Sequence, residues 1–280
     1  MIQRLAIVGV GLLGGSIALG ARAHGLAREI VGIGRDRARL ATPLAAGAVD
    51  RVTTDLAAGV RDADLVVLAA TVLANEQLLA EAWPAVAPAA VITDVGSTKR
   101  GIVAVAERLT GPAAFIGSHP MAGSEKSGYR EARADLFQGA TVIVTPTEAS
   151  EPRAVKGITA FWEALGARVS ALDPHTHDRM VAAISHLPHV VAWTLMDAVA
   201  RFEPEALAFA ARGFKDTTRI AAADPAMWTD ILFDNRDEVA AGLVAFCTAL
   251  NEFARLIADA DRDGIAALLA RIKAQRESLS

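Results

Sequence analysis

A glycine pattern near the N-terminus constrains the fold more than any other feature of the chain. Residues 5–8 read as a buried strand, Gly9-x-Gly11-x-x-Gly14 as a turn, and the Ala-rich segment after it as a helix. In such a unit the first glycine permits a tight turn, the second lets a pyrophosphate approach the backbone, and the third lets helix and strand pack closely. The N–H groups at the helix N-terminus then face the phosphates. Glycine turns also serve purely structural roles, but this context favours a dinucleotide site.

Apolar runs separated by helical segments extend this unit to residue 173. Further strands are predicted at residues 29–34, 64–70, 89–97, 113–120, 139–146 and 167–173, with a helix at 151–166. Several of these runs are continuously apolar, as expected of parallel strands covered on both faces. We therefore expect an α/β fold in which residues 1–173 form a doubly wound, Rossmann-type dinucleotide-binding domain.

The pattern changes to helices at Pro174. Asp173 precedes it as a predicted N-cap, with the proline at the first helical position. Residues 174–280 are predicted to form an all-α domain for substrate binding and dimerisation. Its polar segments, described below, suit a ligand, and pairing with a second copy is plausible because its helices carry more apolar surface than a small bundle buries. The single cysteine, Cys247, excludes a disulfide within the chain and is expected to be buried.

Composition limits the classes of partner. The 280 residues are 52% hydrophobic and carry a formal net charge of −4, which disfavours a general nucleic-acid or anionic-membrane surface. The apolar N-terminal stretch is interrupted by glycines, lacks a cleavage pattern and is short for a membrane span. We expect a cytoplasmic protein that binds a small molecule.

The type of cofactor depends on the end of the strand at 29–34. An acidic residue that binds the ribose of NAD normally stands there, but this chain has Gly34 followed by Arg35. A glycine leaves room for a 2′-phosphate and an arginine supplies a cation, so NADP is favoured. In the alternative, Asp36 takes the ribose and the cofactor is NAD. The remaining predicted cofactor contacts are Leu12, Leu13 and Thr71.

Polar residues gather at positions where a doubly wound fold binds its ligands. Ser97 stands at the end of the strand at 89–97, and His119 precedes Pro120 in the polar stretch Gly117–Gly128. In the helical half, Ser185 and His189 share one face of a helix, and we expect Pro188 to kink this helix. A further stretch holds Lys215, Asp216 and Arg219, of which the arginine suits a carboxylate. No metal site is expected, because the closely spaced histidines lack a zinc-binding pattern.

Four spaced motifs resemble a known family. "GSHPMAGSEKSG", "AISHLPH", "GFKDTTRIA" and "DPAMW", in this order behind "GVGLLGGS", are similar to the prephenate/arogenate dehydrogenases of tyrosine biosynthesis. The resemblance spans about residues 5–269. It implies oxidative decarboxylation of prephenate or arogenate with hydride transfer to NAD(P)+, giving 4-hydroxyphenylpyruvate or tyrosine, by a homodimer.

The resemblance also implies roles for single residues. His119 would accept the substrate's hydroxyl proton, oriented by Ser97, and His189 with Ser185 would position the substrate. Further substrate contacts implied or considered are Arg219, Ser124, Glu125, Lys126, Lys215 and Trp228, the last reaching the neighbouring subunit's site.

Two alternatives remain open from the sequence. One is a β-hydroxyacid or imine reductase with the same two-domain plan. The other is a non-catalytic dimer that senses a dinucleotide, which would leave Ser97, His119 and His189 without a role. The preference between prephenate and arogenate also stays open.

Overall fold

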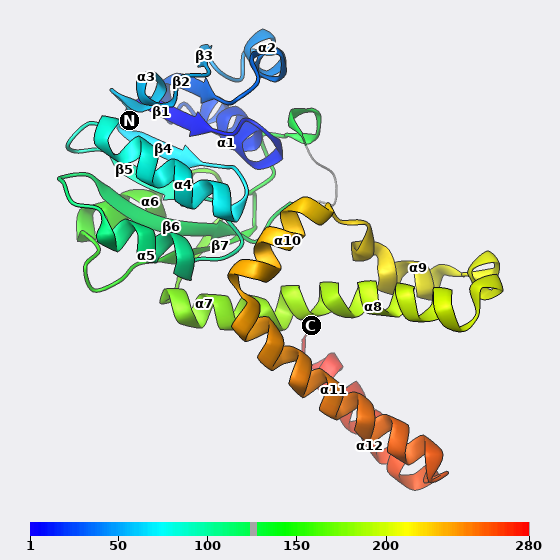
Figure 1. The fold of residues 1–280 in the computed structure, drawn as a ribbon. Helices are drawn as coiled ribbons and strands as arrows, with labels where there is room; N and C mark the ends of the chain where they lie inside the picture. The colour runs from blue at the N-terminus through cyan, green and yellow to red at the C-terminus, as the bar shows by residue number, and fades with distance from the viewer. Residues whose placement is uncertain (124–127, 280) are drawn as a thin grey trace. The chain divides into compact units, whose positions relative to one another are not determined.

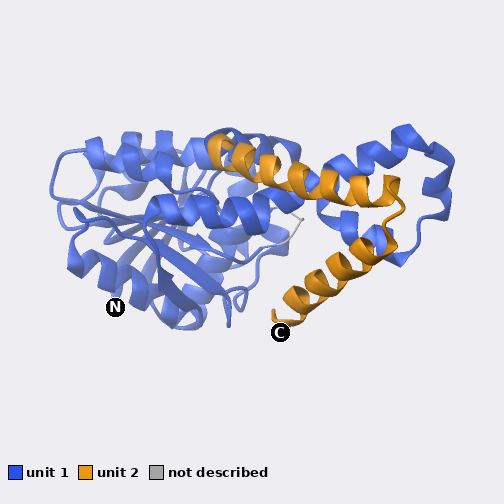
Figure 2. Cartoon of the chain, turned by 90° about the horizontal axis from the view of Figure 1, so that it is seen from below, with its two compact units in different colours: residues 1–235 blue, residues 236–280 orange. Residues whose placement is uncertain are grey.

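The computed structural model describes residues 1–123 and 128–279 (Figure 1). The chain divides into two compact units, residues 1–235 and 236–280 (Figure 2). The domain boundary predicted between residues 173 and 174 lies inside the first unit and stays a prediction.

In the described part of the chain, eight strands form one sheet. They are β1 (Ile2–Val8), β2 (Ala27–Ile33), β3 (Arg51–Thr53), β4 (Leu65–Leu68), β5 (Val91–Asp94), β6 (Ala114–Pro120), β7 (Thr141–Thr145) and β8 (Arg168–Ala171). Their order is β3-β2-β1-β4-β5-β6-β7-β8, and β7 runs antiparallel to β6 and parallel to β8. The doubly wound sheet is thereby confirmed. Strand β3 was not predicted, since three residues carry no periodicity.

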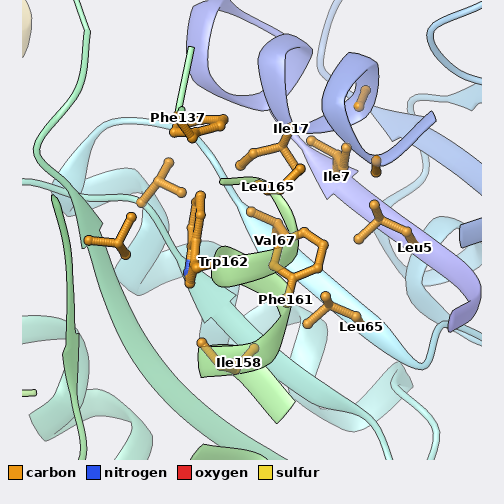
Figure 3. Packing of buried hydrophobic residues seen from close by; sticks show 14 of the residues in the cluster. Leu5, Ile7, Ile17, Leu65, Val67, Phe137, Ile158, Phe161, Trp162 and Leu165 are labelled. Atoms are coloured by element: carbon orange, nitrogen blue, oxygen red, sulfur yellow. The ribbon is translucent and has the colours of Figure 1, made fainter. Parts of the chain in front are cut away.

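Helices cover both faces of this sheet (Figure 1). They are α1 (Leu12–Ala23), α2 (Arg37–Ala45), α3 (Leu56–Val60), α4 (Val72–Ala82), α5 (Arg100–Arg108) and α6 (Pro152–Ala164). Leu5 and Ile7 of β1 join one buried cluster with α1 and α6, and Ala6 and Val8 join another with α3 to α5. Trp162 of α6 is fully buried in the first cluster (Figure 3). This two-sided burial is the reason why the strands read as unbroken apolar runs.

The remaining elements of the first unit are helical, as predicted. They are α7 (Pro174–Val181), the π-helical turn η3 (Ala182–His186), α8 (Leu187–Phe202), α9 (Arg212–Thr218) and α10 (Pro225–Asp234), with short 3₁₀ turns between them. The Asp173 carboxylate accepts the Thr176 N–H at 3.0 Å, which confirms the predicted cap. The π-helical turn ends two residues before Pro188, so the irregularity expected at this proline is present.

The second unit consists of two helices, α11 (Arg236–Ala258) and α12 (Arg262–Glu277) (Figure 2). By length and composition alone, α11 is apolar enough to cross a membrane. Its apolar residues Val244, Leu250 and Ile257 are exposed. The expectation that Cys247 is buried was wrong: it is exposed, because the apolar face of this helix is left uncovered in the single chain.

Candidate active site

The glycine turn has the steric properties that its sequence predicts. Gly9 has a φ of +96°, and a Cβ there would lie 2.6 Å from the Ala69 carbonyl oxygen. A Cβ on Gly14 would collide with the Gly9 carbonyl oxygen, whereas one on Gly11 would meet nothing within 4 Å. Two of the glycines are therefore required for packing, and the third leaves the N-terminus of α1 open to a ligand.

A cavity of about 740 Å³ opens over this turn. Its lining residues are Gly9, Val10, Gly11, Gly34, Arg35, Asp36, Arg39, Leu40, Thr42, Gly128, Tyr129 and Arg130. Leu12, Leu13 and Gly14 form the first turn of α1 directly after it, and Thr71 is exposed at the N-terminus of α4. Backbone N–H groups, open space above Gly11 and arginines in the lining fit the phosphates of a dinucleotide.

The Asp36 carboxylate serves its own helix. Its Oδ1 accepts the N–H of Ala38 at 2.8 Å and that of Arg39 at 3.4 Å, which makes it the N-cap of α2. Its Oδ2 lies 3.5 Å from Arg39 Nε. Gly34, immediately beyond β2, adds no side chain to the cavity, and a Cβ there would lie 3.3 Å from the Leu40 side chain.

His119 lies inside strand β6, not in a loop beyond it. The strand continues to Pro120, and His119 pairs with Ile143 of the antiparallel β7. This agrees with the strand predicted at 113–120, because the residue before a proline favours extended backbone and β7 is available as a partner. The side chain is 8% exposed, near the carboxyl end of its strand.

The His119 ring is the first of three linked side chains. Its Nδ1 lies 2.9 Å from His177 Nε2, and His177 Nδ1 lies 2.7 Å from Asp178 Oδ1. Burial holds the pKa of His119 well below 6.5, and electrostatic interactions with His177, Lys99 and His186 lower that pKa further. His119 is thus a neutral imidazole at pH 7.

A buried ion pair and Asp178 connect this histidine to the loop between β5 and α5. Lys99 and Asp94, both buried, form an ion pair. The Asp178 carboxylate accepts the backbone N–H of Lys99 at 2.8 Å and that of Arg100 at 3.0 Å. Ser97, half-buried, lies in the same loop, which these contacts immobilise.

A second group of aromatic side chains surrounds His189 on α8. Its Nδ1 donates to the Ser185 carbonyl oxygen at 2.9 Å. Its ring stacks on Trp228 of the same chain, with centroids 3.7 Å apart and planes at 30°. The pKa of His189 lies below 6.5, mainly because the ring is partly buried. Its bond to Ser185 acts in the opposite direction, and the charge of Arg219 adds to the lowering. The arginine therefore lies within electrostatic range of the ring.

The other predicted substrate residues are only partly described. Arg219 and Lys215 are exposed at the end of α9, where Asp216 lies 3.2 Å from Arg212. Trp228 is buried against its own chain, and its predicted reach to a neighbouring subunit stays a prediction. Ser124, Glu125 and Lys126 lie outside the described residues.

Sequence reasoning missed the residues behind His119. His177 was only one of the closely spaced histidines considered for zinc, and Asp178, Asp94 and Asn235 were not singled out. Asn235 donates to the Asp178 carbonyl oxygen at 2.8 Å and lies 3.1 Å from His186 Nδ1. One signal in the sequence could have drawn attention to His177. Asp173 marks the start of α7, so His177 lies one helical turn after the N-cap, next to Asp178 in the chain.

The two halves of the chain match two models of one family. Residues 17–171 match the nucleotide-binding domain of prephenate dehydrogenase, and residues 173–271 match its dimerization domain. The chain belongs to the prephenate dehydrogenase family. This confirms the resemblance carried by the sequence motifs and, with it, the predicted succession of a nucleotide-binding fold and a helical region.

Relatives with assigned names agree with this family. The chain is 33% identical to the cyclohexadienyl dehydrogenase of Zymomonas mobilis over 275 residues, which covers 94% of this chain and 91% of the relative. It is 36% identical to the prephenate dehydrogenase of Bacillus subtilis over 244 residues, covering 85% of this chain and 66% of that longer relative.

Solved structures of the prephenate dehydrogenase family have the same fold. Prephenate dehydrogenase from Aquifex aeolicus, in complex with hydroxyphenyl propionate and NAD+, superposes with a TM-score of 0.93 at 31% identity over 100% of this chain and 99% of that one. The arogenate dehydrogenase of Synechocystis gives 0.84 at 27% identity, with 99% and 100% covered. The nucleotide-binding domain of this family and the NAD+ bound in the Aquifex structure support a nicotinamide dinucleotide as the cofactor.

Proposed function

We propose that this chain oxidatively decarboxylates prephenate, arogenate or both, as an NAD(P)-dependent dehydrogenase of tyrosine biosynthesis. The main support is His119, a buried neutral imidazole near the carboxyl end of β6. In a doubly wound sheet, ligands bind beyond the carboxyl ends of the parallel strands, where the glycine turn also lies. A proton acceptor and a dinucleotide cavity thus share one edge of the sheet.

The reaction assigns a proton to this histidine. A nicotinamide held in the cavity would supply the acceptor for the hydride that leaves ring carbon C4 of the substrate. His119 takes the proton of the C4 hydroxyl as the C=O bond forms. Loss of CO₂ leaves its bonding electrons in the ring, which becomes aromatic, and the phenolate oxygen takes back the proton. A neutral base at pH 7 suits this step, whereas an imidazolium does not.

Substrate binding is assigned to the His189 group. His189, held by the Ser185 carbonyl and stacked on Trp228, presents a fixed ring edge. Arg219 offers a planar cation for a substrate carboxylate, and Lys215 adds positive charge nearby. Ser97, in the loop tied by Asp178, is assigned to orienting His119 and the hydroxyl. From the motif alone, Ser124 and Glu125 are assigned to the pocket entrance and Lys126 to positive charge for the substrate.

We favour NADP as the cofactor. Arg35 and Arg39 line the cavity beside Gly34, and their charge suits a 2′-phosphate. The Asp36 carboxylate, the alternative ribose ligand, is engaged by the N–H groups of α2. Titrating the purified protein with NADP+ and NAD+ separately, by tryptophan fluorescence, tests the preference. Tighter binding of NAD+ would overturn it.

The active form is proposed to be a cytoplasmic homodimer, with no nucleic-acid or membrane partner. The match to a dimerization domain and the exposed apolar residues of α11 support a second copy as the occupant of that face. The same occupant accounts for the apolar composition of α11 without a membrane.

Measuring turnover of both substrates tests the proposed reaction. Reduction of the cofactor with either one, at a kcat/KM above that of a β-hydroxyacid, supports it. Cofactor binding without turnover would favour the non-catalytic sensor instead.

A further inference from the structure

Three buried side chains form a continuous hydrogen-bonded line behind the proposed base. His119 Nδ1 and His177 Nε2 are 2.9 Å apart, and His177 Nδ1 and Asp178 Oδ1 are 2.7 Å apart. The two rings meet edge to face, with centroids 5.1 Å apart at 66°. All three are buried, so water does not compete for these bonds.

Asp178 fixes the direction of the line at one end. Its two oxygens accept the backbone N–H groups of Lys99 and Arg100 and, at 3.2 Å, the guanidinium Nε of Arg100. Although burial acts in the opposite direction, the bond to His177 and the backbone N–H groups lower the pKa of the Asp178 carboxyl. The group is therefore a carboxylate that can only accept, so His177 Nδ1 carries a hydrogen.

The second bond follows from the first. Burial lowers the pKa of His177 below 6.5 even though Asp178 opposes this, so the ring is neutral at pH 7. A neutral imidazole with hydrogen on Nδ1 has a bare Nε2, which accepts. His119 Nδ1 must then be the donor in the 2.9 Å contact. The single ring hydrogen of the neutral His119 is therefore on Nδ1, and its Nε2 carries none.

We propose that His177 and Asp178 are positioning residues that hold His119 in the tautomer with hydrogen on Nδ1 and a bare Nε2. This rests on the proposed function of His119 as the base. In the reaction the substrate O–H bond breaks as the Nε2–H bond forms, while the Nδ1 hydrogen stays bonded to His177 Nε2. In hydrolase triads, a buried carboxylate orients the histidine base by accepting a hydrogen bond from the ring nitrogen that does not take the proton. Here the His177 ring lies between the Asp178 carboxylate and the His119 base.

His177 gives a cleaner test than Asp178. Asp178 also holds the backbone of the β5–α5 loop, so replacing it disturbs Ser97 as well. In His177→Leu the acceptor for His119 is lost, whereas in His177→Gln a side-chain amide oxygen can take its place. His175→Leu, an exposed histidine on the same helix, is the matched control.

The first measurement is direct and needs no substrate. In full-length protein labelled with ¹⁵N-histidine at about pH 8, above the ordinary pKa of histidine, nitrogen shifts report which ring nitrogen is protonated. We expect hydrogen on Nδ1 of His119 in the wild type and in His175→Leu. Hydrogen on Nε2 in the wild type would overturn the assignment, whatever the activity and whether or not the variants fold.

The second measurement separates this proposal from the function on which it rests. We expect His177→Leu to lower kcat by at least about 10-fold at little change in KM, with His177→Gln recovering most of the loss. If His119→Asn loses activity but folded His177→Leu does not, the positioning role is refuted. If neither variant loses activity, the role of His119 as base is refuted, while the nitrogen shifts still decide the tautomer.

Discussion

At the residue scale, His119 is surrounded by groups that disfavour a positive charge. Its own burial, His177 and the Lys99 ammonium all lower its pKa. Strand β6 and its partner β7 fix the backbone, so the ring has a defined position. These conditions are those of a proton acceptor that remains neutral until a substrate arrives.

Replacing this histidine tests its role. We expect His119→Asn to lower kcat by at least about 10²-fold with little change in KM, since a general base acts mainly in the transition state. Steady-state kinetics measure both. An unimpaired kcat would remove His119 from the mechanism.

The pH dependence of activity follows from the same pKa. The base works only when neutral, so activity is lost as the pH falls through its pKa. Because that pKa lies well below 6.5, the acidic limb of kcat/KM should also lie below 6.5. An acidic limb above pH 7 would contradict a buried, neutral His119.

Arg219 carries a prediction about binding. We expect Arg219→Gln to raise KM strongly, by about 2–4 kcal/mol in binding free energy, because a substrate carboxylate loses its cation. Lys156→Gln, on α6, removes a positive charge elsewhere and should leave KM unchanged. Equal KM in wild type and Arg219→Gln would refute the contact.

Single residues also show how far sequence reasoning reached. Gly9, Gly11, Gly34 and Arg35 were recognisable because their types suit phosphate and lie at fixed positions after strands. His177 was not, because its partner His119 is 58 residues away and only the fold joins them. The roles assigned to Ser97, His189 and Arg219 stay predictions.

At the scale of elements, α4, α5 and α10 bring two carboxyl groups together. Glu76 and Asp234 both lie against Gly101 in the first turn of α5, where a Cβ would collide with them. Burial and the charge of Asp234 raise the pKa of Glu76 to about 7, and burial raises that of Asp234. The folded state therefore carries an electrostatic cost when Glu76 is ionised.

This cost predicts a pH-dependent stabilisation. A raised pKa in the folded state means that the cost is complete above about pH 7, declines as the pH falls below 7 and vanishes only below the ordinary value of 4.5. Glu76→Gln should thus raise the free energy of unfolding at about pH 8 by roughly 1 kcal/mol, after allowance for solvent screening. The gain should shrink at about pH 5.5. Denaturant unfolding at both pH values measures it.

The control is Glu81→Gln, an exposed position on the same helix. A gain in both variants, or a gain that is larger at the lower pH, would contradict the carboxyl pair.

Elements were predictable where they are long and apolar. The strands were foreseen because both their faces are buried, and α7 because Asp173 and Pro174 mark its start. The antiparallel direction of β7 was not, since strand direction depends on the connection and not on composition.

At the scale of the whole molecule, the helices of the second unit present an uncovered apolar face. Leu250 and Ile257 of α11 and Leu269 of α12 are more than half exposed, at 55%, 64% and 51%. The apolar spacing in the sequence predicted this surplus of apolar surface, but the spacing does not identify the molecule that covers it. The exposed Cys247 arises from the same face.

The proposed dimer predicts a change in mass. We expect the wild type to sediment as a dimer and Leu250→Glu to shift toward monomer, because a buried unpaired charge is costly. Leu250→Met keeps the face apolar and should remain dimeric. A monomeric wild type would contradict the dimer.

The central claim is that the cavity over the glycine turn and the base on β6 serve one oxidative decarboxylation. Purified protein is mixed with prephenate or arogenate and NADP+ or NAD+, and both the absorbance of the reduced cofactor and the released CO₂ are followed. We predict one CO₂ for each reduced cofactor with at least one substrate. Cofactor binding with no turnover of either substrate, or reduction without CO₂, would contradict the claim.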